Sequence, residues 1–86
     1  MPGASVEYKA SVAGDLDRLD RAVALRVLKK IEKTLVEEGR SGEPLAGEFA
    51  GLFRLRVGDY RVIYTVDDAL FIVAIESVRH RREAYR

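Results

Sequence analysis

The spacing of apolar and polar residues changes along the chain, from a helical period in the first half to alternation in the second. Apolar residues recur every three or four positions between residues 21 and 38, in a stripe made of Ala24, Val27, Leu28, Ile31 and Leu35. This spacing predicts an amphipathic helix. Asp20 suits its N-cap, and Gly39 follows Glu38, where a helix end favours a left-handed residue.

Two shorter elements are predicted before this helix. Residues 5–10 alternate apolar and polar side chains and predict a strand. Leu16 and Leu19 have helical spacing and predict a short helix over residues 11–20, which Gly14 weakens.

A loop and three strands are predicted after the helix. Residues 39–51 hold four of the seven glycines and one of the two prolines, which is typical of a loop. Alternation then predicts three strands, over residues 52–57, 60–66 and 69–78. The turns between them are expected at Gly58-Asp59 and Asp67-Asp68.

The order of these elements predicts a single α+β domain over residues 1–86. One N-terminal strand precedes a helical hairpin and a three-stranded antiparallel meander, with the helices packed on one face of the sheet. A chain of 86 residues is long enough for one small domain and too short for two. Its 48% of hydrophobic residues can supply a core.

The two hairpin turns predict which side chains share a face. A two-residue turn at Gly58-Asp59 sets Arg56 opposite Arg61, on the face away from the core. The core face then carries Phe53, Leu55, Val57, Tyr60, Val62 and Tyr64. The other face, which we call the arginine face, carries Arg54, Arg56, Arg61 and Ile63. Directly opposed like charges destabilise a sheet, so this face indicates a bound anion or an acidic partner.

The second turn predicts where the C-terminal tail begins. A two-residue turn at Asp67-Asp68 would set Ala74 opposite Arg61 and end the third strand near Val78, beside the arginine face. The tail, "RHRREAYR", could then fold back and bring Arg81 and Tyr85 to this face.

Composition narrows the classes of partner. The net charge is +1, but residues 51–86 hold seven arginines, no lysine and five acids, a sum of +2. Arginine is the residue for bidentate contact with phosphate or carboxylate. A second basic surface, Arg26, Lys29, Lys30 and Lys33 on the long helix, is interpreted as solvent-exposed, with RNA backbone as the alternative.

Several functions are excluded or disfavoured. There is no cysteine and only one histidine, so neither a disulfide nor a structural zinc site is expected. No apolar run reaches the roughly 20 residues of a membrane span, and the N-terminus lacks a signal-peptide pattern. We therefore expect a soluble cytoplasmic protein with no metal, no cofactor and no membrane partner.

The arginines allow one kind of chemistry. Arginine stays protonated, so it cannot be a general base, but it can bind a phosphodiester and stabilise charge that develops there. RNA can be cleaved without metal when a 2′-OH attacks the adjacent phosphate. His80 could supply acid–base chemistry or could be a solvent-exposed tail residue without a role. Tyr85 could stack on a base or donate a proton.

The segments "FRLRVGDYRVIYTV" and "VRHRREAYR" together resemble the RelE group of the RelE/ParE toxin superfamily, toxins of bacterial and archaeal toxin–antitoxin modules. The order of elements also matches, so the resemblance covers nearly the whole chain. It implies a toxin that enters the ribosomal A site and cleaves mRNA there by 2′-OH attack. It also implies as partners the ribosome with its rRNA, the mRNA, and a cognate RelB-like antitoxin that wraps the domain.

The resemblance also implies roles for single residues. Arg61 matches a catalytic arginine, Arg81 an arginine that contacts the scissile phosphate, and Tyr85 a tyrosine that stacks on a nucleotide. Arg54 takes the place of a basic residue on the preceding strand. Leu52 stands where some relatives have a second catalytic lysine, so the general base would be His80 or a ribosomal group.

Arg56 and Arg82 complete the prediction for RNA binding, because one shares the arginine face and the other lies in the tail. Two other functions stay open. A ParE-like toxin of the same fold would inhibit DNA gyrase without cutting RNA, and a degenerate toxin would only bind its antitoxin. The tail arginines and Tyr85 favour the nuclease.

Overall fold

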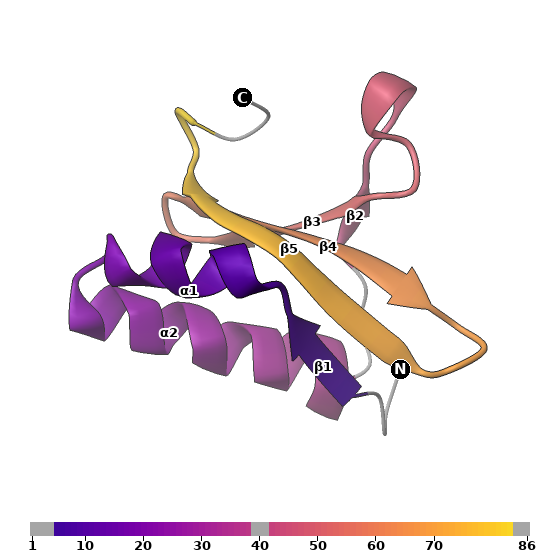
Figure 1. Cartoon of the computed structure of the whole chain (residues 1–86), viewed down its shortest axis with the longest axis horizontal. Coiled ribbons are helices and arrows are strands. Elements are labelled where there is room, and N and C mark those ends of the chain that lie inside the picture. Colours follow the sequence, from indigo (N-terminus) through magenta and orange to yellow (C-terminus); the bar gives the residue numbers. More distant parts are fainter. Residues whose placement is uncertain (1–4, 39–41, 84–86) are drawn as a thin grey trace.

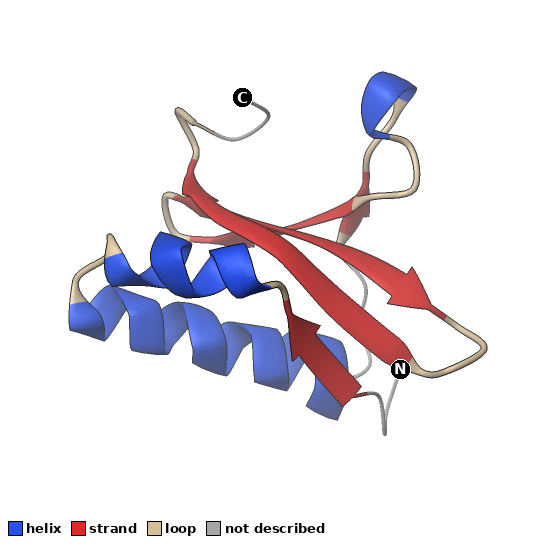
Figure 2. Cartoon of the chain, in the orientation of Figure 1, coloured by secondary structure: helices blue, strands red, loops and turns tan. Residues whose placement is uncertain are grey.

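The computed structural model describes residues 5–38 and 42–83 and arranges them in two layers (Figure 1). Two helices cover one face of a five-stranded sheet with strand order β1-β5-β4-β3-β2 (Figure 2). The strands are β1 (Ser5–Tyr8), β2 (Glu43–Pro44), β3 (Phe53–Val57), β4 (Tyr60–Asp67) and β5 (Ile72–His80). The α+β class and the packing of the helices on one sheet face are confirmed.

Both predicted helices are present, and the longer one changes its winding. The first is α1 (Ala10–Asp17); the second is α2 (Arg21–Ile31), continued by the π-helical turn η1 (Glu32–Glu37). In η1 the Glu38 N–H donates to the Lys33 carbonyl, five residues back, at 2.9 Å. Thr34 and Leu35 are both buried there, so the wider turn keeps this end of the helix against the core.

The hydrophobic core lies between the helices and the sheet. It is formed by the buried side chains Val12, Val27, Ile31, Leu35, Leu55, Val57, Val62, Tyr64, Val73, Ile75 and Val78. Phe53 and Tyr60 pack against it. The predicted core face of the first hairpin is therefore confirmed. No helix of the described residues is long and apolar enough to cross a membrane.

The strand β5, which is the last in the sequence, is paired with a neighbouring strand on both sides. On one side β5 pairs with β4, and on the other it pairs in parallel with β1 from Ser5↔Ile72 to Tyr8↔Ile75. Beyond the end of β1, β5 contacts the helix α1. There the buried Asp15 carboxylate accepts a hydrogen bond from the Val78 N–H at 3.0 Å. This bond satisfies a backbone donor of β5 close to the C-terminal tail.

The register of the first hairpin is as predicted. Val57 pairs with Tyr60, Arg56 with Arg61, and Leu55 with Val62. Gly58 adopts a φ of 58°, a left-handed conformation that a two-residue hairpin turn requires and that glycine adopts without strain.

The register of the second hairpin differs from the prediction: Arg79, not Ala74, lies opposite Arg61. The last pair is Asp67↔Ile72, so the loop has four residues instead of two. The Asp67 carboxylate accepts the N–H groups of Ala69 and Leu70 at 3.0 and 3.1 Å and shapes this loop. A bulge, in which Ile63 pairs with Ser77 but Tyr64 with Ile75, moves the partner by one more residue.

The predicted loop over residues 39–51 also contains regular structure. The two residues of β2 pair with Phe53 and Arg54, and a 3-10 turn, η2 (Gly47–Phe49), follows. Gly42 lies against β3 so closely that a Cβ there would be 2.2 Å from the Arg54 carbonyl oxygen. Its N–H donates to the hydroxyl of the buried Tyr64, whose pKa is raised by that burial. β2 therefore requires glycine at position 42.

Candidate nucleic-acid interface

Three arginines lie side by side across the sheet, on the face away from the helices. Arg56 on β3 pairs with Arg61 on β4, which pairs with Arg79 on β5. We call these residues the arginine row. Neighbouring strands are about 4.8 Å apart, so the row brings three positive charges together. None of the three forms an ion pair with a carboxylate of the described residues, so the row is a candidate site for an anion.

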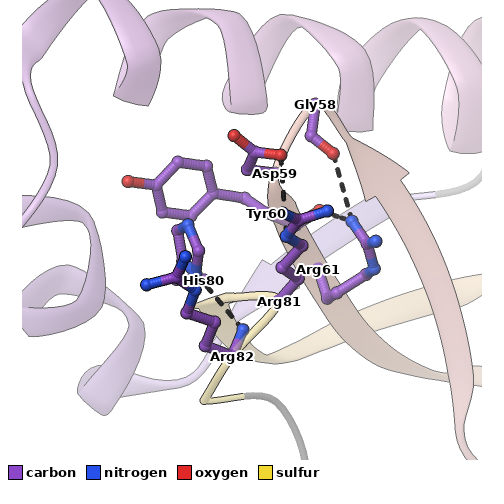
Figure 3. Close-up of polar contacts among 7 residues, drawn as sticks. All are labelled: Gly58, Asp59, Tyr60, Arg61, His80, Arg81 and Arg82. Atoms are coloured by element: carbon purple, nitrogen blue, oxygen red, sulfur yellow. Dashed lines mark hydrogen bonds and ion pairs between the residues drawn. The ribbon is translucent and has the colours of Figure 1, made fainter.

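Arg61 is held at the turn between β3 and β4 (Figure 3). Its Nη1 atom donates to the carbonyl oxygens of Gly58 and Tyr60, each at 3.1 Å. These acceptors are uncharged, so a phosphate, which makes stronger charge-assisted hydrogen bonds, can replace them.

Arg81 is anchored at the same turn (Figure 3). Its backbone N–H donates to the Asp59 carbonyl oxygen at 2.7 Å, and its Nε lies 3.9 Å from Asp59 Oδ1. Both side chains are exposed. Arg81 is the first residue after β5 and is held at Asp59. It therefore lies at the same end of the sheet as the turn that holds the Arg61 side chain.

His80 lies on the opposite face from the arginine row. It is the cross-strand partner of Tyr60, and the two rings meet edge to face with centroids 5.4 Å apart. Its Nδ1 accepts the Arg82 N–H at 3.2 Å, which fixes the first turn of the tail. The structure therefore does not bring the imidazole to the arginine row, and the acid–base role of His80 stays a prediction.

Arg54 lies two residues along β3 from Arg56, in a second cross-strand row with Ile63 and Ser77. It forms a hydrogen-bonded ion pair with Glu43 on β2. The hydrogen bond, and then the charge of Arg54, lower the pKa of Glu43. The guanidinium is therefore already paired with a carboxylate, unlike those of the arginine row.

The other residues predicted to bind RNA or to act in catalysis are Arg56, Arg82 and Tyr85. Arg56 is exposed on β3, and Arg82 is exposed in the tail. Tyr85 lies outside the described residues.

Arg79 is a candidate that the sequence analysis missed. Its Nε is buried and has no hydrogen-bond partner among the described residues. The "VRHRR" motif contains it, but only the observed register sets it beside Arg61. A donor buried without a partner is costly, so this atom is a place where the side chain gains by rearranging when a ligand binds.

Arg79 also borders a cavity of about 510 Å³ on this face. Its apolar lining residues are Leu45, Phe49, Leu52 and Ile63. Its polar lining residues are Glu48, Glu76, Ser77 and Arg79. The segment with β2 and η2 and the end of β5 both rise on the side of the sheet opposite the helices (Figure 1).

A basic groove of about 780 Å³ lies between α2 and the end of β3. Its cationic lining residues are Arg26, Lys29, Lys30, Lys33 and Arg56. Leu25, 47% exposed, and Gly58 also line it. The basic face of α2 is therefore exposed, as predicted, and through Arg56 it joins the arginine row.

Residues 5–38 and 42–83 contain no cluster of three or more His, Cys, Asp or Glu side chains that could hold a metal ion. The guanidinium groups of the arginine row can bind and polarise a phosphate.

Comparison with known proteins shows the family to which this chain belongs. The model of the ParE toxin of type II toxin–antitoxin systems matches residues 6–85. Toxin RelE of Mycobacterium tuberculosis is 35% identical over 82 residues, which cover 94% of this chain and 84% of that protein. Toxin RelG of the same organism is 35% identical over 83 residues, which cover 95% of each.

Solved structures agree with these relatives. The toxin–antitoxin complex RelBE2 of Mycobacterium tuberculosis contains a chain that matches with a TM-score of 0.85 and 33% identity, covering 96% of this chain and 97% of that one. The isolated E. coli RelE toxin has the same fold, with a TM-score of 0.73 and 21% identity over 91% of this chain and 84% of that one.

The family match, the two relatives and the shared fold define a toxin of a type II toxin–antitoxin system. The chain belongs to the RelE/ParE superfamily, in its RelE group.

Proposed function

We propose that this toxin is a ribosome-dependent endoribonuclease that cleaves mRNA in the A site and so stops translation. The observation that supports this proposal best is the arginine row, three guanidinium groups that form no ion pair among the described residues, beside the tail residue Arg81. Such a cluster suits a phosphodiester, whose charge increases in the transition state.

In the proposed reaction the 2′-oxygen of one nucleotide attacks the adjacent phosphorus and the 5′-oxygen of the next nucleotide leaves. The products are a 2′,3′-cyclic phosphate and a 5′-hydroxyl, without metal or other cofactor. The proton of the 2′-OH passes to a base, and the leaving oxygen gains a proton from an acid.

The side chains take separate roles in this proposal. Arg61 and Arg81 leave their contacts with the turn at Gly58 and Asp59, bind the scissile phosphate and stabilise its developing charge. Arg54, Arg56 and Arg82 bind neighbouring parts of the RNA. Tyr85 stacks on a base, which is worth about 1–3 kcal/mol.

The proton acceptor of this mechanism is not one of the arginines, because guanidinium groups stay protonated. His80 is the candidate from the sequence, but its ring packs against Tyr60 on the helix-bearing face. A group supplied by the ribosome therefore fits the role better, and we assign His80 to holding the tail through its bond with the Arg82 N–H.

We also propose two partners for the basic groove beside α2. The rRNA backbone suits its five cations, because phosphate contacts need charge and not a base-specific shape. A RelB-like antitoxin suits the same groove through an acidic segment with an apolar anchor on Leu25. It would bury apolar surface on the helix-bearing side and cover the arginine row or displace the tail.

A map of mRNA ends after induction of the toxin in cells tests the proposal. New 5′ ends at a fixed position within codons, in the reading frame, are expected. The alternative is a ParE-like gyrase inhibitor, since the matched family model is that of the ParE toxin. Loss of DNA supercoiling with intact mRNA would replace the nuclease by a gyrase inhibitor.

A further inference from the structure

The cavity of about 510 Å³ beside Arg79 has no role in the phosphate chemistry proposed above. Ile63 lies at its wall and is 7% exposed, although it lies on the face away from the hydrophobic core. Leu45 and Leu52, from the segment around η2, also line it. A concave, partly apolar surface of this size suits a flat ring.

The polar lining of the cavity is rich in acceptors. Its lining residues include Glu48 and Glu76, whose side chains end in carboxylates, and Ser77, the cross-strand partner of Ile63, which carries a hydroxyl. Glu76 Oε1 lies 2.6 Å from Lys9 Nζ. An ionised carboxylate has about four acceptor positions, so this ion pair leaves Glu76 able to accept from a ligand.

The cavity and the arginine row share one residue. Arg79 borders the cavity and is also the β5 member of the row. A ligand that fills the cavity therefore has its next group within reach of guanidinium donors. A nucleotide has this order of parts: a flat, partly apolar base that carries hydrogen-bond donors, next to an anionic phosphate.

We propose that the cavity binds one base of the RNA strand whose phosphates lie on the arginine row, and that it favours guanine. This inference rests on the proposed function. Guanine presents two adjacent donors, N1–H and the N2 amino group, which one carboxylate accepts together. Adenine and cytosine offer a single amino group, and uracil a single imino group. Bidentate pairs of this kind supply most of the discrimination between bases.

The two glutamates also argue against an acidic antitoxin segment in the cavity. Carboxylates of such a segment would face Glu48 and Glu76, and like charges in contact repel. A base meets no such repulsion, because it is uncharged and its polar edge donates.

Titration of the ¹⁵N-labelled full chain with the four nucleoside 5′-monophosphates tests the proposal by NMR. These nucleotides contain no cleavable linkage, so the active toxin can be used. Guanosine monophosphate is expected to shift the amide signals of Ile63, Glu76 and Ser77. It should bind about tenfold more tightly than the adenosine compound.

Two variants separate ligand binding from structure. Glu76→Gln should abolish the preference for guanosine, because its amide has only one acceptor oxygen. Lys9→Met removes the same ion pair but leaves the carboxylate, so it should keep the preference. Loss of the preference in both variants would assign Glu76 a structural role and overturn the inference.

The inference and the proposed function can fail separately. Equal binding of all four nucleotides, or no shift at the cavity at millimolar concentrations, would overturn the base site and leave mRNA cleavage untouched. An acidic antitoxin peptide that shifts the cavity signals where nucleotides do not would also overturn it. Intact mRNA in induced cells, with guanosine still bound in the cavity, would instead count against the nuclease.

Discussion

At the scale of single residues, the turn at Gly58 and Asp59 sets the positions of Arg61 and Arg81 in the absence of RNA. It holds the Arg61 side chain through carbonyl oxygens and the Arg81 backbone through one more. These contacts position both arginines without neutralising Arg61. We therefore expect that either side chain can be removed with little effect on the fold, which lets function be tested apart from stability.

Arg61→Ala and Arg81→Ala are each expected to abolish toxicity and to change thermal stability little. Each variant loses one donor to the scissile phosphate, which by analogy with an oxyanion donor costs about 2.7–4 kcal/mol, or a factor of about 100–1,000 in rate. Arg61→Ala also relieves repulsion in the arginine row. Growth after induction and thermal melts of the purified variants measure the two effects.

Arg21→Ala is the control for both variants, because Arg21 is an exposed cation at the start of α2 and outside the proposed interface. It should stay toxic. Full toxicity of Arg61→Ala or Arg81→Ala would contradict the assignment of these residues.

At the scale of elements, the register of β5 decides which residue completes the arginine row. The first hairpin could be predicted, because a two-residue turn with glycine fixes its register. The second could not, because neither the four-residue loop nor the bulge at Ile63 and Tyr64 leaves a distinct mark in the sequence. Arg79 and its cavity were missed for that reason.

Other elements were missed because they depend on contacts that are distant in sequence. β2 is only two residues long and forms where Gly42 approaches β3 and Tyr64. The face on which His80 lies follows from the same register that sets Arg79 opposite Arg61. The order of the main helices and strands, by contrast, follows from local periodicity and was predicted.

The bond between α1 and β5 is expected to stabilise the strand that carries Arg79. Asp15 is 6% exposed, and its carboxylate is the acceptor of the Val78 N–H. Asp15→Ala should lower the free energy of unfolding by about 1.5–3 kcal/mol, the usual effect of a hydrogen bond to a charged group. Asp17→Ala, on the exposed side of α1, should change it by less than about 0.5 kcal/mol. Urea unfolding of both variants gives the comparison, and equal values would refute the role of Asp15.

Two glycines should respond to alanine in opposite directions. Gly42→Ala should destabilise the fold by about 1–3 kcal/mol, because its Cβ would lie 2.2 Å from a backbone oxygen of β3. Gly14→Ala should stabilise it by about 0.4–1 kcal/mol, since Gly14 lies in α1 and its Cβ would meet nothing within 4 Å. Chemical denaturation measures both, and a stable Gly42→Ala variant would show that β2 does not need this close approach.

At the scale of the whole molecule, the basic surface extends from the arginine row around the edge of β3 to α2. Arg56 belongs to both the row and the groove, and Leu25 adds an exposed apolar side chain. One antitoxin segment along this surface would therefore block rRNA and mRNA together. A segment that folds on binding suits such an extended surface.

Leu25→Glu is expected to weaken antitoxin binding at least tenfold, because it replaces the apolar anchor by a charge that repels an acidic segment. Calorimetry with the antitoxin encoded beside the toxin gene measures the change. Leu70→Glu is the control, since Leu70 is also an exposed leucine, 65% against 47% for Leu25, but lies on the loop between β4 and β5. Equal weakening by both substitutions would argue against the groove as the antitoxin site.

The most direct test of the central claim is cleavage of a defined mRNA on purified ribosomes. We expect the toxin to cut the A-site codon once, to leave a 2′,3′-cyclic phosphate and a 5′-hydroxyl, and to need the ribosome. A single 2′-deoxy substitution at the attacking nucleotide should abolish that cut, and Arg61→Ala should slow it by a factor of about 100–1,000. Cleavage that persists at the 2′-deoxy nucleotide, or ribosome-bound mRNA that stays intact, would contradict 2′-OH attack on a phosphate held by the arginine row.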